Sequence, residues 1–123
     1  MTGMLPVQDA VTHLVEVARD GDAATGAATY PAELPVLAGH FPGNPVVPGV
    51  HVVGLVLALV RAALGQPDLA IAAIGRVKWP RVSLPGDRLE VAVKWRETDD
   101  GLQVDGTVAN GGEVACKVRL TCR

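Results

Sequence analysis

The chain has 123 residues, of which 49% are hydrophobic but only 3% aromatic, and its formal net charge is −2. This length suits a single domain spanning residues 1–123, with a core built mainly from aliphatic side chains. The weakly negative charge gives no reason to expect a nucleic-acid-binding protein.

The N-terminal third predicts two strands followed by an irregular segment. Leu14–Ala18 and Ala23–Tyr30 have strand-like composition and flank turn residues at 20–22. The next segment, Pro31–Pro48, contains five prolines. So many fixed backbone angles exclude a regular helix or strand, and we expect a rigid loop.

Val50–Leu64 is apolar on nearly every side. Its valines favour a strand, but its length is ordinary for a helix and long for a strand. Pro48 before the segment and Gly65 just after it match the usual punctuation of a helix. A helix that is apolar all round is expected to be buried. We therefore predict a central buried helix.

The C-terminal half alternates between apolar and polar residues, which is typical of antiparallel strands with one buried face. The predicted strands are Ile71–Trp79, Arg88–Trp95, Leu102–Ala109 and Val114–Cys122. Short segments rich in Gly, Asp, Asn and Pro separate them and can form tight turns. The pattern predicts four strands in sequence within a curved antiparallel sheet. A curved sheet wrapped around one buried helix is the α+β hotdog fold.

The two cysteines, Cys116 and Cys122, belong to one predicted strand. Six residues of strand separate their Cα atoms by roughly 20 Å, which is far beyond disulfide reach. No signal peptide is visible, and the apolar run Val50–Val60 is about half of the roughly 20 residues that a membrane span needs. We therefore expect a reduced, cytoplasmic protein that does not cross a membrane.

Residues 39–50 are the most specific part of the sequence. They read Gly39-His40-Phe41-Pro42-Gly43-Asn44-Pro45-Val46-Val47-Pro48-Gly49-Val50. This run resembles the active-site signature of the FabZ/FabA-type 3-hydroxyacyl-[acyl-carrier-protein] dehydratases, which have the hotdog fold. The resemblance continues through the apolar helix and the Pro85-Gly86-Asp87 segment, and it covers roughly the last 90 residues.

The resemblance implies a lyase that acts on acyl thioesters in fatty-acid, polyketide or polyene-type synthesis, without a metal or cofactor. His40 takes the place of the catalytic base, and a neutral histidine suits that role at cellular pH. The amide of Gly49, at the helix N-terminus, takes the place of the donor to the thioester oxygen. Phe41, Pro48 and Val50 take substrate-binding positions.

The resemblance also implies two kinds of partner. The substrate is carried on the phosphopantetheine of an acyl carrier protein, and the pocket forms between two subunits of a dimer. Basic residues cluster between Arg76 and Arg96, including Lys78 and Arg81. Arg76, Lys78 and Arg81 could attract an acidic carrier protein, although they could equally be solvated faces of strands.

One departure from the family pattern limits the functional prediction. The family has a Glu or Asp fourteen positions after the histidine, and this chain has Gly54 there. Three interpretations remain open. His51, on the same helix face, could donate the proton. A different hotdog subunit could supply the carboxylate to His40. The protein could instead bind acyl groups without turnover, or hydrolyse the thioester.

Overall fold

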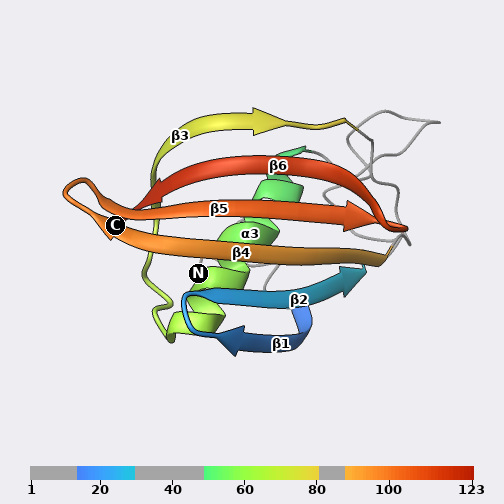
Figure 1. The fold of residues 1–123 in the computed structure, drawn as a ribbon, viewed down its shortest axis with the longest axis horizontal. Helices are drawn as coiled ribbons and strands as arrows, with labels where there is room; N and C mark the ends of the chain where they lie inside the picture. The colour runs from blue at the N-terminus through green and yellow to red at the C-terminus, as the bar shows by residue number, and fades with distance from the viewer. Residues whose placement is uncertain (1–13, 30–48, 81–87) are drawn as a thin grey trace, which may run out of the picture.

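The structure, a computed structural model, describes residues 14–29, 49–80 and 88–123, with residues 49–51 described by their backbone alone. Its elements are β1 (Leu14–Asp20), β2 (Ala23–Thr29), α3 (Gly49–Leu64), β3 (Ile71–Lys78), β4 (Arg88–Thr98), β5 (Gly101–Asn110) and β6 (Glu113–Cys122). The strands form one antiparallel sheet in the order β1-β2-β4-β5-β6-β3, curved around α3 (Figure 1). The predicted sheet around a central helix is confirmed.

The hairpins β4–β5 and β5–β6 form where the turn chemistry predicts them. Thr98 pairs with Gly101, and Asn110 pairs with Glu113, so each turn has two central residues. In the second turn Gly111 and Gly112 both have positive φ, at 62° and 84°. Glycine adopts this conformation without steric cost, and such turns match the twist of the strands that they join.

Alternation along β4 and β6 places one face of each strand in the core, as predicted. The buried face of β4 ends at Trp95, which is 7% exposed. Beyond it β4 continues to Thr98, three residues further than predicted. Arg96 and Glu97 are both exposed, so the burial pattern that marks a strand in the sequence is lost while the backbone pairing continues.

The helix α3 begins at Gly49, one residue before the predicted start, and ends at Leu64 as predicted. Gly65 follows with a φ of 64°, and the amide of Gln66 donates to the carbonyl of Arg61 at 3.0 Å. This is the Schellman arrangement, in which a left-handed glycine closes the helix. Residues Val52 through Val60 are all buried, so the prediction of a central buried helix is confirmed.

Two strand glycines allow α3 to lie close to the sheet. A Cβ atom on Gly106 of β5 would lie 2.5 Å from one methyl carbon of Val56. A Cβ atom on Gly26 of β2 would lie 3.2 Å from the Leu59 side chain. The helix therefore crosses the sheet from β5 toward β2, and its C-terminal turn reaches β1, where Arg19 donates to the Ala63 carbonyl. Its N-terminal half lies toward the β6–β3 half of the sheet (Figure 1).

The predicted sequential arrangement of the last four strands is wrong for β3. This strand pairs with β6 instead of β4, and β4 pairs with β2. Short turns join β4, β5 and β6, whereas β3 and β4 are not neighbours in the sheet. A strand pattern in the sequence indicates which residues are extended, but it does not indicate which strand an edge strand pairs with.

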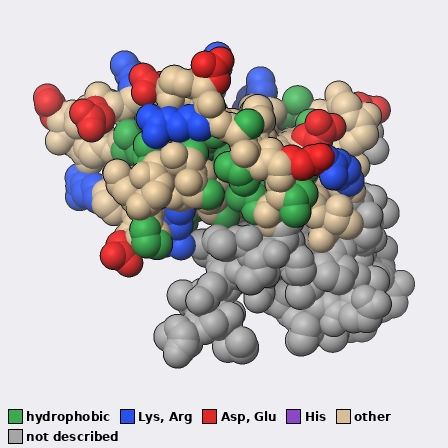
Figure 2. All heavy atoms as spheres, turned by 90° about the horizontal axis from the view of Figure 1, so that it is seen from below, with side chains coloured by type: hydrophobic (Ala, Val, Ile, Leu, Met, Phe, Trp, Pro, Cys, Tyr) green, Lys and Arg blue, Asp and Glu red, His purple; other side chains and the backbone are tan. Residues whose placement is uncertain are grey.

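The two edge strands, β1 and β3, expose apolar side chains. Val15 and Val17 of β1 are 49% and 42% exposed, and Ile74 of β3 is 55% exposed. Trp79, just after β3, is 49% exposed and so lies outside the core. Figure 2, which views the molecule from the side of β1, shows hydrophobic side chains reaching the surface there. Within the described residues, no helix is long and apolar enough to span a membrane.

Candidate functional site

The described residues include the helix side of the predicted site but not its loop. His40, Phe41 and Pro48 lie outside them, as does Arg81. The roles predicted for these four residues therefore remain predictions. Gly49 is the first residue of α3.

The N-terminal turn of α3 has the electrostatic character that the predicted oxyanion site needs. The first four amides of a helix have no partner within the helix, and the aligned peptide dipoles place positive potential at this end. The first turn, which includes Gly49, Val50 and His51, contains no acidic residue that would neutralise that potential. An amide at Gly49 could therefore stabilise a developing negative charge on a carbonyl oxygen.

Gly54 is buried, within the run of buried residues that extends to Val60. The whole of α3 contains no Asp or Glu, so this helix provides no carboxylate. His51 precedes Gly54 by three residues, and residues at that spacing share one helix face. His51 therefore lies on the helix face of Gly54, and its role as a proton donor remains a prediction because its side chain lies outside the described residues.

Two of the three predicted docking residues, Arg76 and Lys78, lie on the outer face of the sheet, away from α3. Both are exposed on β3. Their direct partners across the strand pair are also basic, since Arg76 pairs with Arg119 and Lys78 pairs with Lys117. These four residues line an open groove of about 650 Å³, which we call the basic groove.

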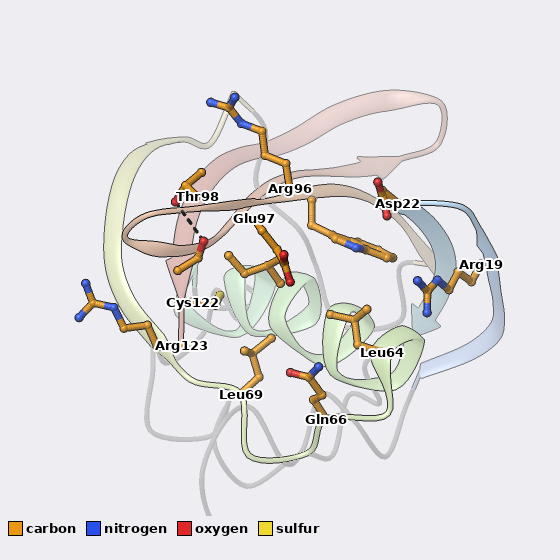
Figure 3. A pocket seen from close by; sticks show the side chains of 13 residues that line it. Arg19, Asp22, Leu64, Gln66, Leu69, Arg96, Glu97, Thr98, Cys122 and Arg123 are labelled. Atoms are coloured by element: carbon orange, nitrogen blue, oxygen red, sulfur yellow. Dashed lines mark hydrogen bonds between the residues drawn. The ribbon is translucent and has the colours of Figure 1, made fainter.

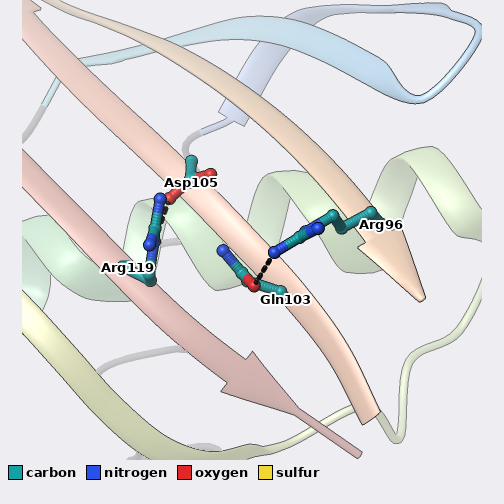
Figure 4. Close-up of polar contacts among 4 residues, drawn as sticks. All are labelled: Arg96, Gln103, Asp105 and Arg119. Atoms are coloured by element: carbon teal, nitrogen blue, oxygen red, sulfur yellow. Dashed lines mark hydrogen bonds and ion pairs between the residues drawn. The ribbon is translucent and has the colours of Figure 1, made fainter. Parts of the chain in front are cut away.

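The acidic residue in the basic groove is Asp105 of β5. The Arg119 guanidinium donates to Asp105 at 2.7 Å (Figure 4), and this interaction raises the pKa of Arg119. Lys117 and Arg119 are polar residues of the predicted strand Val114–Cys122, and from the sequence they had no predicted role in docking. Their alternation on β6 was visible, but their position beside Arg76 and Lys78 depends on the strand order.

A second cavity, of about 670 Å³, lies at the opposite end of α3, and Trp95 and Arg19 line it (Figure 3). The Arg19 guanidinium lies 5.3 Å from the centre of the Trp95 ring and donates to the carbonyls of Gly21 and Ala63. Arg61 likewise donates to the Leu69 carbonyl at 2.6 Å. The polar groups at this end hold the helix C-terminus in place, so we assign them a structural role.

Neither a disulfide nor a metal site is found in the described part of the chain. Cys116 and Cys122 are free thiols buried on the inner face of β6. Burial raises the pKa of Cys116 to about 11 and also raises that of Cys122. A thiol with a raised pKa is a weak nucleophile and a poor metal ligand. No group of three or more His, Cys, Asp or Glu residues gathers among the described residues.

Comparison with known proteins identifies the family and the fold of this chain. The family model described as ApeI-like, ApeI dehydratase, matches residues 16–117. The 3-hydroxyacyl-[acyl-carrier-protein] dehydratase FabZ of Chloroflexus aggregans is 34% identical over 119 residues, covering 89% of this chain and 81% of that enzyme. FabZ of Mannheimia succiniciproducens is 34% identical over 96 residues, covering 72% of this chain. The alignment spans only 64% of that relative's length.

Solved structures share the fold at lower identity. The ApeI:P dehydratase heterocomplex from Xenorhabdus doucetiae includes a chain that superposes with a TM-score of 0.72 at 21% identity, covering 89% of this chain and 95% of that one. The PaaI protein of E. coli superposes with the same TM-score of 0.72 at 16% identity, covering 95% of this chain and 86% of that one. These similarities confirm the predicted hotdog fold. With its family model matched over most of its length and a curated relative covered over four fifths, the chain belongs to the ApeI-like family of hotdog dehydratases.

Proposed function

We propose that this protein is one half of a two-subunit dehydratase acting on 3-hydroxyacyl groups carried by an acyl carrier protein. In this proposal His40 supplies the base, and a related hotdog subunit supplies the carboxylate that α3 lacks. The observation that carries the proposal is Gly54, a buried glycine on a helix without Asp or Glu. The ApeI:P structure, named as a heterocomplex, supports pairing of unlike subunits.

The proposed reaction divides the proton transfers between two groups. His40 removes a proton from the carbon next to the thioester carbonyl, and those electrons form the new carbon–carbon double bond. The bond from the next carbon to its hydroxyl oxygen breaks, and the partner's carboxylic acid protonates that oxygen, which leaves as water. Amides at the start of α3, including that of Gly49, stabilise charge on the thioester oxygen during the transfer.

The exposed edge of β3 is the surface that we propose for subunit pairing. Edge strands carry unpaired backbone groups that can join another sheet. In β3 the exposed Ile74 adds apolar area that a partner would remove from water. The N-terminal half of α3, with Gly54, lies toward this half of the sheet. Pairing here, in a homodimer or a heterodimer, would bring a second helix near Gly54.

The cytoplasmic location of this protein stays a prediction.

A mass-spectrometric dehydration assay on 3-hydroxyacyl carrier protein tests the proposal. Wild-type protein alone should give little product. Gly54→Glu restores a carboxyl group and should increase turnover, whereas Gly54→Gln adds similar bulk without an acid and should not. Adding His40→Ala to the Glu variant should abolish the gain. General acid catalysis typically contributes about 10²- to 10⁴-fold, so the gain should be large enough to measure.

Other results of the same assay would refute the two-subunit proposal. Full turnover by the wild-type homodimer, lost in His51→Ala, would assign the proton donor to this chain. Release of the free 3-hydroxy acid and the carrier thiol would identify a thioesterase. Tight binding of the acyl carrier protein, without turnover by any variant or by this chain mixed with a related hotdog subunit, would identify a non-catalytic acyl-binding protein.

A further inference from the structure

The basic groove contains pairs of like charges that do not stabilise the fold. In an antiparallel sheet, directly paired residues point to the same face with Cβ atoms about 5 Å apart, and like charges in such pairs are destabilising. Here two adjacent pairs, Arg76–Arg119 and Lys78–Lys117, are both basic. Among the residues that the structure describes, no carboxylate forms an ion pair with Arg76, Lys78 or Lys117.

The spacing of the four cations limits what they can bind. Residues two apart on a strand are separated by about 6.6 Å, and neighbouring strands by about 4.8 Å. The positive groups therefore begin at the corners of a rectangle of about 5 by 7 Å. Carboxylates on one face of a helix, three or four residues apart, begin about 5–6 Å from one another. One turn of an acidic helix therefore matches the groove in both charge and size.

A long polyanion fits the molecule less well. The chain as a whole has a formal net charge of −2, so positive potential is local to this part of the surface. Nucleic acids and membranes present negative charge over areas much larger than this rectangle and favour extended basic surfaces. A compact acidic partner gains from the local cations while avoiding most of the remaining acidic surface.

We propose that the basic groove, formed by Arg76, Lys78, Lys117 and Arg119, binds an acidic helix of the acyl carrier protein that delivers the substrate. This inference rests on the proposed function, since a carrier-bound substrate supplies the partner. It adds Lys117 and Arg119 of β6 to the predicted docking residues. In this proposal the negative charge of Asp105 opposes binding of the acidic helix. The groove lies on the same half of the sheet as the N-terminal half of α3, on the opposite face.

Binding of carrier protein without its phosphopantetheine arm tests the groove separately from the active site. Fluorescence anisotropy at low salt would follow labelled apo-acyl carrier protein. Lys117→Glu should weaken binding about tenfold, because it reverses one cation and engages Lys78. Asp105→Asn should strengthen binding severalfold, because it removes the opposing charge. Arg96→Glu is the matched control: Arg96 lies on the same exposed face, hydrogen-bonded to Gln103 at 2.9 Å and outside the groove (Figure 4).

Equal weakening by Lys117→Glu and Arg96→Glu would reduce the effect to net charge and overturn the proposal, as would no weakening by either. Binding of coenzyme A in the groove without binding of the apo carrier would also overturn it, since the phosphate would then be the ligand. Turnover of a carrier-free pantetheine thioester by Gly54→Glu should not change when Lys117→Glu is added. Absence of turnover in Gly54→Glu itself would refute the proposed function, whereas the binding of apo-acyl carrier protein would still test the groove.

Discussion

The close approach of α3 to β5 at Gly106 gives a stability prediction with a definite magnitude. An alanine Cβ at Gly106 would lie 2.5 and 2.7 Å from the two methyl carbons of Val56. Carbon atoms in ordinary contact are about 3.5–4.0 Å apart, so roughly 1 Å of displacement is needed in a fully buried region. Overpacking of this kind costs about 1–3 kcal/mol, and we expect Gly106→Ala to fall near the upper end.

The reverse change at Val56 should rescue this loss. Val56→Ala alone removes two buried methyl groups, which are worth about 0.8 kcal/mol each, and leaves a cavity, for a total of about 2–3 kcal/mol. In the double variant the alanine methyl of residue 106 fills part of that cavity. We therefore expect the double variant to lose only about 1–2 kcal/mol, far less than the sum of the single losses.

Urea denaturation followed by circular dichroism measures all three variants. Gly75→Ala is the control, because a Cβ there meets only Arg119 atoms at 3.7 Å, an ordinary contact. Gly26→Ala, with its nearest contact at 3.2 Å, should be intermediate. Additive losses in the double variant would refute the reasoning, because residues in direct contact must couple. A loss at Gly106 no larger than that at Gly75 would refute the close approach itself.

Three further predictions follow from the described contacts. Burial raises the pKa of Cys116 to about 11 from 9.0, so native protein should react with a thiol reagent only after unfolding. As pH rises, the Cys116 thiol loses its proton at a lower pH in the unfolded chain than in the folded one. The contribution of Cys116 to the free energy of unfolding should therefore be complete below pH 9 and be lost between pH 9 and 11. Arg19→Ala removes the contacts of Arg19 with the helix C-terminus and the Trp95 ring and should lower the free energy of unfolding by about 1–2 kcal/mol in urea titrations, with Arg19→Lys in between. Lys117→Glu turns a repulsive pair with Lys78 into an attractive one and should raise the Tm at low salt; about 0.5 M NaCl should remove most of this gain, and a Tm below wild type would contradict the charge argument.

Much of the fold could be predicted because its signals are local. The strands β4 to β6 each show a period of two in the sequence, and glycine-containing turns join them. The helix α3 was identifiable from its length, from Pro48 before it and from Gly65 after it, although its valines favour strands. Burial of the whole segment Val52 to Val60 explains why no polar face marks it as a helix. These features depend on neighbours only a few residues away.

The features that required the structure depend on distant residues. The pairing of β3 with β6 joins Lys78 to Lys117, residues 39 positions apart, and no local pattern encodes that choice. From the sequence, only Arg76 and Lys78 of the basic groove could be predicted as docking residues, without their partners on β6. The small residues that let α3 approach the sheet were also missed, because the role of Gly106 depends on Val56 facing it from another element.

The register between β2 and β4 has a consequence for how this protein could be altered. Thr29 and Arg88 are direct partners in the sheet, so the segment between them, residues 30–87, begins and ends at adjacent positions of the sheet, and within it β3 pairs with β6. Residues 30–87 include the histidine-containing segment, α3 and β3. Because the ends of this segment meet, a replacement need not shift the strands on either side of it. It must, however, keep β3 paired with β6 and keep the close contact of Val56 with Gly106. Residues 30–87 thus give the boundaries for chimeras between hotdog proteins, in which the segment with His40, α3 and β3 is exchanged while β1, β2 and the β4–β6 meander are kept.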